Sequence, residues 1–353
     1  MITVQFKLTL TPEQELLLHS STMEYIRCVN MLSAKMMESS EPLKLSTADF
    51  QAELPSAVKN EVIRAAKSVV VRHKKGICET LSVLKKPVVT WNNQNFKLVD
   101  GVLSFPLWVD GKSQRIAVRG ITTEYQQERL DTKLQSLRIT QKNGKWMAQI
   151  AVVHPAFENV GDGIMGIDLG LKIPAVSVTD NDVVKFFGNG RMNKYMKRKF
   201  RSQRKSLGKS KKKKAISKLG NKEQRWMKDQ DHKISRAIVN HAKENNVSTI
   251  RMEQLQNIRK TARTSRKNEM NLHSWSFYRL AGFIEYKADM LGIKVEYVNP
   301  AYTSQKCPQC GERNKTDTRS YLCHTCGHNT HRDIVGASNI ISAPVSSGKR
   351  KAA

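Results

Sequence analysis

Four cysteines near the C-terminal end constrain the fold more than any other feature of this 353-residue chain. They form two Cys-x-x-Cys pairs separated by twelve residues, with a glycine after each pair: Cys307, Cys310, Cys323 and Cys326. Four soft thiolates at this spacing are typical of one tetrahedral zinc ion with no open position, which makes the site structural. A redox dithiol is the alternative, but no thioredoxin-like unit flanks the pairs. We therefore predict one Zn²⁺ in a zinc ribbon at residues 305–331.

Three acids lie at the ends of apolar runs or at the start of a helical segment, where a carboxylate is expected to need a cation or a hydrogen-bond donor. Asp168 ends the apolar run GIDLG, Glu253 lies near the end of TIRMEQL, and Asp333 begins a helical segment directly behind the ribbon. A buried carboxylate is costly unless it binds a cation or accepts hydrogen bonds. Three acids on separate elements suit a site that holds two Mg²⁺ about 4 Å apart for phosphodiester chemistry. The pattern alone is equally consistent with turn, cap or solvent-exposed roles.

The chain is strongly basic, with 60 Lys and Arg against 31 Asp and Glu and a net charge of +29. Such an excess indicates a polyanionic partner, above all nucleic acid. Residues 191–236 hold 19 basic residues and three acids, a net +16 that is over half of the excess. The predicted nucleic-acid contacts there are Arg198, Arg201, Arg204, Lys211, Lys212, Lys213 and Lys214. A solvated, partly flexible charged surface is the alternative interpretation.

The hydrophobic pattern divides the chain into three parts and indicates an α+β, multidomain fold. Alternating apolar residues predict a strand at 1–10, and the capping box Thr11-Pro12-Glu13-Gln14 begins a helical region that extends to about residue 85. Short β runs with Asp-Gly and Asn-Gly turns follow to His154, and we expect an antiparallel barrel completed by the first strand. After ENVGDG come three strands, a helix, the strand VSTIRMEQL, a helix ended by Gly292, and the strand IKVEYV.

The chain shows no sign of a membrane or export segment. No run of about 18 apolar residues is present, and the first residues alternate instead of forming a basic segment followed by an apolar one. Cys28 and Cys78 stand alone in helical-looking sequence and are expected to be buried thiols, which fits a reducing compartment. We therefore expect a cytoplasmic protein with no membrane partner.

Four stretches resemble the TnpB proteins of bacterial and archaeal insertion sequences, which are relatives of the type V CRISPR nucleases. They are GIDLGLKIPAVS, MEQLQN, WSFYRLAGFIEYKADMLGIKVEYVNPAYTSQKCPQCG and RSYLCHTCGHNTHRDIVGASNI, within residues 160–342. The resemblance implies a RuvC-like nuclease of the RNase H type in which Asp168, Glu253 and Asp333 hold the two Mg²⁺. Arg319 matches an arginine of the family's ribbon region that helps to place the scissile phosphate. Many members read DRDxNAA where this chain reads HRDIVGA, which keeps the acid Asp333.

The resemblance also implies a domain organisation and a function. The expected domains are the first strand of a β (wedge) module at 1–10, a helical recognition domain at 11–86, the rest of the wedge module at 87–157, the nuclease domain at 158–304 and 332–345, the target-binding ribbon at 305–331, and a basic tail at 346–353. The expected partners are a guide RNA from the transposon end and double-stranded target DNA, bound by a monomer or by a homodimer on one RNA. The expected activity is RNA-guided double-strand cleavage in a bacterial or archaeal cytoplasm, at the nucleoid.

Three alternative functions share these sequence features. A transposase that cuts transposon ends directly would use the same acids. A regulator that binds DNA without cutting would not need them, so their presence favours a nuclease. A miniature CRISPR effector would be biochemically almost identical.

Overall fold

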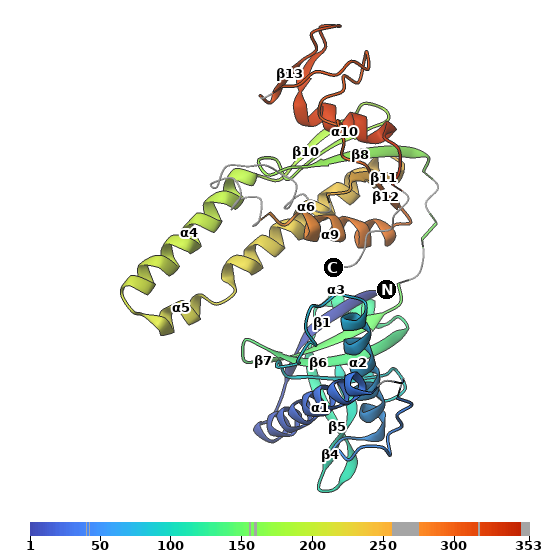
Figure 1. The fold of residues 1–353 in the computed structure, drawn as a ribbon, viewed down its shortest axis with the longest axis vertical. Coiled ribbons are helices and arrows are strands. Elements are labelled where there is room, and N and C mark those ends of the chain that lie inside the picture. The colour runs from blue at the N-terminus through green and yellow to red at the C-terminus, as the bar shows by residue number, and fades with distance from the viewer. Residues whose placement is uncertain are drawn as a thin grey trace. The chain divides into compact units, whose positions relative to one another are not determined.

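The computed structural model describes residues 1–39, 41, 43–154, 157–158, 161–255, 275–316 and 318–346. The chain divides into two compact units, Met1–His154 and Pro155–Ala353, and most of their elements are labelled in Figure 1. Apart from Ser346, the basic tail predicted for 346–353 lies outside the described residues. None of the described helices combines the length and the apolar character needed to span a bilayer.

The first unit is built on a seven-stranded antiparallel sheet. Its strands are β1 (Ile2–Thr9), β2 (Val88–Trp91), β3 (Lys97–Val99), β4 (Val102–Val109), β5 (Lys112–Ile121), β6 (Leu134–Lys142) and β7 (Lys145–Val152). The strand order is β2-β6-β7-β1-β5-β4-β3, so the N-terminal strand completes the sheet, as predicted. Both residues of each predicted Asp-Gly or Asn-Gly turn, at 100–101, 110–111 and 143–144, have positive φ, as tight hairpins require.

Helices of the first unit share one hydrophobic core with this sheet. They are α1 (Pro12–Glu38), α2 (Ser56–Lys74) and the short α3 (Glu124–Leu130). The predicted capping box begins α1, with the Thr11 side chain accepting from the N–H of Gln14. Leu18 of α1 and Val58 of α2 belong to the same core as Trp91 of the sheet. The helical region ends at Lys74 rather than near residue 85.

The sheet of the first unit is open, which corrects the predicted barrel. Strands β2 and β3 are its two edges, and the sheet curls into a half-barrel without closing. A small closed barrel fills its interior with its own side chains. Here α1 and α2 pack on the sheet and supply the apolar surface that closure would otherwise have provided.

The second unit contains a five-stranded mixed sheet with the order β10-β9-β8-β11-β12. Its strands are β8 (Gly163–Leu169), β9 (Ala175–Thr179), β10 (Val184–Phe187), β11 (Val247–Glu253) and β12 (Lys294–Val298). Its helices include α4 (Gly190–Lys209), α5 (Lys213–Leu219), α6 (Lys222–Glu244), α9 (Phe277–Asp289) and α10 (Arg332–Ser342). β8, β9 and β10 are antiparallel neighbours, whereas β11 runs parallel to β8 and to β12. All five strands predicted for this part of the chain are present.

Helices cover both faces of the five-stranded sheet (Figure 1). On one face, Ile250 of β11 packs in a core with Ile238 of α6 and Ile284 of α9. On the other face, α10 packs against β8 and β9. A Cβ atom at Gly166 of β8 would lie 2.1 Å from the backbone oxygen of Ala337 in α10. Glycine at position 166 is therefore what allows helix and strand to approach this closely.

Replacement of Gly166 by alanine tests this close packing. In Gly166→Ala the added methyl group would overlap the Ala337 carbonyl, so we expect α10 to shift and the free energy of unfolding to fall by roughly 1–3 kcal/mol. The matched control is Gly208→Ala in α4, where an added Cβ meets nothing within 4 Å and alanine is the better helix former. Urea unfolding followed by circular dichroism measures both variants, and equal midpoints would contradict the expectation.

Candidate active site

Two of the three predicted acids lie side by side at the ends of neighbouring strands. β8 and β11 are parallel, and Ile167 pairs with Met252. The next residues along the strands, Asp168 and Glu253, therefore lie in one row of the sheet. Ile167 and Met252 belong to the core beneath α6 and α9, and alternate residues point to opposite faces. Both acids thus project to the face on which α10 packs.

The third acid, Asp333, lies in the first turn of α10. His331 caps this helix, because its Nδ1 accepts the backbone N–H of Asp333 at 3.2 Å. Further along α10, a Cβ atom on Gly336 would lie 3.0 Å from a carboxylate oxygen of Asp168. The packing of the helix on β8 therefore carries Asp333 toward the strand acids.

Glu253 and Asp333 lie close enough to Asp168 to affect the ionisation of its carboxyl group. Burial, followed by the charges of Glu253 and Asp333, raises the pKa of Asp168 to about 8, although Arg332 and Arg319 oppose the shift. Such a cluster of carboxylates in a buried place is costly unless a cation offsets the repulsion. Its hard oxygen donors fit a divalent cation of the Mg²⁺ type.

Two acids have side-chain partners in the structure. The Thr303 hydroxyl donates a hydrogen bond to the Glu253 carboxylate, while burial raises the pKa of Glu253 against this hydrogen bond. The guanidinium of Arg319 forms an ion pair with Asp333. Arg319 was expected near the site from the resemblance, whereas Thr303 was missed, because a threonine in the loop NPAYTSQK has no periodic or charge signal that would single it out.

The four cysteines gather at one point of the second unit. Their sulfur atoms lie within 4.8 Å of one another. Gly311 and Gly327 both have positive φ, and each donates its N–H to the carbonyl of the first cysteine of its pair at 3.0 Å. Backbone N–H groups, first that of Cys326, lower the pKa of Cys323 to about 6, whereas the pKa of Cys310 and that of Cys326 are raised by burial and because the adjacent thiols share their protons through hydrogen bonds. This donor set fits one structural Zn²⁺.

The cysteine ribbon is physically joined to α10. Its strands, β13 (Ser320–Leu322) and β14 (Asn329–His331), form an antiparallel hairpin. Val335 of α10 belongs to the small core of the ribbon together with Tyr321 and Cys323. Asn339 of α10 also donates hydrogen bonds to the backbone oxygens of Thr303, just before the ribbon, and Lys306, at its start, at 2.7 and 2.6 Å. The ribbon therefore holds the helix that carries Asp333.

The predicted nucleic-acid contacts lie on a basic helical hairpin, α4–α5–α6, of which α4 and α5 project away from the five-stranded sheet (Figure 1). Arg198 and Arg201 are exposed on α4, and the lysines at 211–214 are exposed in the following turn and at the start of α5. Arg204 is partly buried and forms an ion pair with Glu223 of α6. Arg204 therefore ties the two long helices together, which the charge pattern did not reveal.

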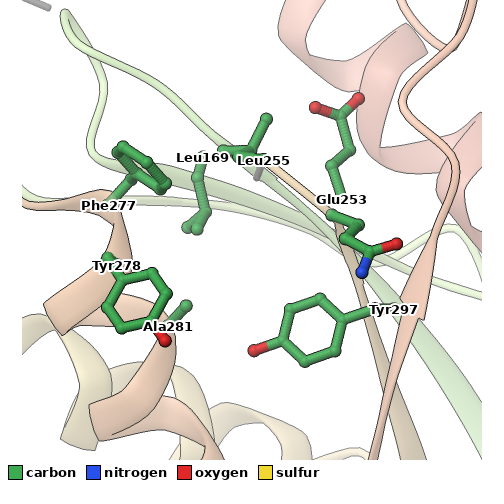
Figure 2. A pocket seen from close by; sticks show the side chains of 8 residues that line it. Leu169, Glu253, Leu255, Phe277, Tyr278, Ala281 and Tyr297 are labelled. Atoms are coloured by element: carbon green, nitrogen blue, oxygen red, sulfur yellow. The ribbon is translucent and has the colours of Figure 1, made fainter. Parts of the chain in front are cut away.

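An apolar cavity of about 20 Å³ lies beside the strand acids. Its lining includes Leu169, Leu255, Phe277, Tyr278 and Tyr297. Figure 2 shows the carboxylate of Glu253 directed away from the rings of Tyr278 and Tyr297. A void of this size holds little more than one water molecule, so it is too small for a nucleotide, and the carboxylate of Glu253, which also lines the cavity, points elsewhere.

Two family models match the second unit. One, described as a probable transposase, matches residues 158–259, and one for the Cas12f1-like TNB domain matches residues 277–340. A TnpB-like protein of Methanocaldococcus jannaschii is 36% identical to the chain over 188 residues, which is 50% of this chain and 67% of that protein. The chain belongs to the TnpB family.

Relatives of this TnpB chain extend to the Cas12f group. The CRISPR-associated endodeoxyribonuclease Cas12f1 of Sulfoacidibacillus thermotolerans is 29% identical over 280 residues, covering 74% of this chain and 63% of that enzyme. A solved complex of Cas12f1 with sgRNA and target DNA matches with a TM-score of 0.71 and 16% identity, over 94% of this chain and 84% of that one. The TnpB chain therefore has the mixed α/β fold of Cas12f1.

Removal of the charge on Asp168 should stabilise this TnpB chain when magnesium is absent. The pKa of Asp168 is raised to about 8 in the folded protein, against about 3.9 in an unfolded chain. The unfolded chain therefore loses its proton first, and the wild-type protein loses stability as pH rises from about 4 to 8. Asp168→Asn cannot ionise, so we expect its free energy of unfolding to exceed that of the wild type by roughly 1–3 kcal/mol at pH 7.

Urea unfolding at pH 5 and at pH 7.5, in magnesium-free buffer, measures this difference. The gap between Asp168→Asn and wild type should widen at the higher pH. Added Mg²⁺ should stabilise only the wild type. The control is Asp182→Asn, an exposed turn residue with positive φ, which should change stability by less than about 0.5 kcal/mol. A pH-independent gap would contradict the expectation.

Proposed function

We propose that this chain is an RNA-guided DNA endonuclease of an insertion sequence, with a RuvC-like nuclease domain. The observation that carries the proposal is the convergence of Asp168, Glu253 and Asp333 on one face of the five-stranded sheet. The sheet supports it, because three antiparallel strands followed by two parallel ones, in the order found here, are the arrangement of RNase H-type domains. Membership of the TnpB family and likeness to a named endodeoxyribonuclease support the same reaction.

The proposed partners are a guide RNA and double-stranded target DNA. The solved relative is a complex with sgRNA and target DNA, and the hairpin α4–α5–α6 offers a cationic surface for such a partner. In this class of nuclease, base pairing with the guide selects the sequence, and the protein holds the backbone. Binding should therefore weaken with salt, by roughly 0.7–0.9 log units of affinity per tenfold rise in salt for each phosphate neutralised. We assign recognition of a short motif beside the target to the unit at 1–154.

The residues of the proposed site divide into metal ligands, a residue that orients one of them and a residue that binds phosphate. Asp168, Glu253 and Asp333 would hold two Mg²⁺, which when bound activate water and stabilise the leaving oxygen of a phosphodiester. Thr303 fixes the orientation of Glu253 by its hydrogen bond. Arg319, paired with Asp333, would turn to the scissile phosphate when DNA enters, because guanidinium groups bind phosphate oxygens strongly.

The central test is whether cleavage depends on a bound RNA and on the acids. Chain purified after expression with its flanking DNA should carry a discrete RNA, and RNase treatment should abolish cleavage of a matched plasmid. Asp168→Ala should bind the target as tightly as wild type but cut it roughly 1000-fold more slowly. Cleavage of bare transposon ends without RNA would instead favour a directly acting transposase, and binding without any cleavage would favour a regulator.

Loss of the zinc site should impair cleavage as well as stability. In Cys323→Ser one thiolate is missing, so the ribbon loses most of its zinc, and the helix that carries Asp333 loses its support through Val335. We expect at least about a tenfold loss of cleavage rate, by analogy with supporting residues of other metal sites. Metal content and cleavage are measured together, with Cys78→Ser, a half-buried cysteine outside the ribbon, as control. A Cys323→Ser protein that cut at the normal rate would show that ribbon and Asp333 are independent.

A further inference from the structure

An aromatic side chain is left exposed at the edge of the nuclease-like sheet. Phe186 lies on β10, an edge strand of four residues, and 46% of it is exposed. Edge strands usually avoid bare apolar side chains, because these promote association with other chains. The neighbouring Phe187 points to the opposite face and is buried in the core under α6. Phe186 therefore takes no part in that core, and packing does not explain why an aromatic side chain is exposed on this edge strand.

The register of the sheet places Phe186 in the row of the acids. Phe186 pairs with Val176 of β9, and Val176 pairs with Asp168 of β8. Residues paired across strands project to the same face, so Phe186 shares the face of Asp168 and lies two strand spacings, roughly 10 Å, away from it. This is within reach of a nucleotide whose neighbouring phosphate lies at the acids.

The ring of His331 packs against Phe186 on one side. His331 meets it edge to face, with ring centroids 5.4 Å apart and planes at 87°. The His331 ring is itself held, because Nδ1 accepts the N–H of Asp333. The edge strand and the start of α10 thus present an ordered aromatic corner beside the carboxylates, and nearly half of Phe186 stays open to solvent.

We propose that Phe186, supported by His331, stacks on a nucleobase next to the scissile phosphate and so positions the single strand over the acids. The inference rests on the proposed nuclease function and adds a substrate contact to it. Every base has a flat aromatic face, so stacking on Phe186 is tolerant of sequence. That tolerance is what a nuclease needs when the guide RNA alone selects the target.

Abasic nucleotides test the stacking contact directly. Matched targets carry one abasic nucleotide at successive positions around the cut, and their cleavage rates are measured with the RNA-loaded full chain. Base–aromatic stacking is worth roughly 5- to 150-fold in an equilibrium. We expect wild type to be slowed about tenfold by an abasic nucleotide at one position. Phe186→Ala should be about tenfold slower on intact DNA and should not be slowed further by that abasic nucleotide.

Three further variants separate stacking from packing. Phe186→Tyr keeps the ring and should behave like wild type, whereas Phe186→Leu keeps the bulk alone and should behave like Phe186→Ala. The control is Val184→Ala, on the same strand and face and 39% exposed, which should keep both the rate and the abasic penalty. If Phe186 only packs on His331, every variant would keep the wild-type ratio between intact and abasic DNA, and the proposal would be wrong.

Binding of the same DNA strands, as single strands, distinguishes this proposal from the nuclease function. Fluorescence anisotropy in the Asp168→Ala background reports their affinity without cutting. If the loss of affinity for abasic strands depends on Phe186 but the RNA-loaded wild type cuts no DNA, the stacking contact stands and the nuclease proposal is wrong. If the wild type cuts DNA but its affinity for abasic strands does not depend on Phe186, the nuclease proposal stands and the stacking proposal is wrong.

Discussion

The close packing of α10 on β8 is the contact on which the candidate site depends. Two glycines permit it: a Cβ atom at Gly166 would overlap the backbone of Ala337, and one at Gly336 would touch the carboxylate of Asp168. A side chain at position 166 would push the helix outward and take Asp333 with it, whereas one at position 336 would crowd the Asp168 carboxylate. The distance of Asp333 from the two strand acids therefore depends on the absence of a side chain at Gly166.

The close packing of three acids makes an unfavourable electrostatic contribution to the folding free energy, which other parts of the second unit must offset. Burial and two neighbouring acids raise the pKa of Asp168, which means that the charged site opposes folding until a cation binds. With Zn²⁺ bound to its four cysteines, the ribbon would act in the other direction, since a structural zinc contributes roughly 10 kcal/mol or more of apparent folding free energy. Its contacts with Val335 and Asn339 transmit that stability to the helix of Asp333. A metal held by the four cysteines would thus support the place where catalytic metals are proposed to bind.

Elements with a local cause were predictable from the sequence. The capping box at Thr11, the Asp-Gly and Asn-Gly hairpins and the strands of the five-stranded sheet were found as expected, because caps, turns and periodicity depend on a few adjacent residues. The barrel was predicted closed and is open, since two helices pack on its sheet. The charge run indicated Arg204 as a nucleic-acid contact, and this stays a prediction; its ion pair with Glu223 is a feature that a count of charges cannot reveal.

The sequence by itself determined the four thiolate ligands and the three acids as candidates, because these depend on residue type, spacing and the ends of apolar runs. Only the tertiary structure decided that Asp168 and Glu253 share a row, that Asp333 reaches them on a helix, and that Phe186 lies in the same row. The physical reason is that strand register and helix packing join residues far apart in the chain. No local propensity encodes the distance between them.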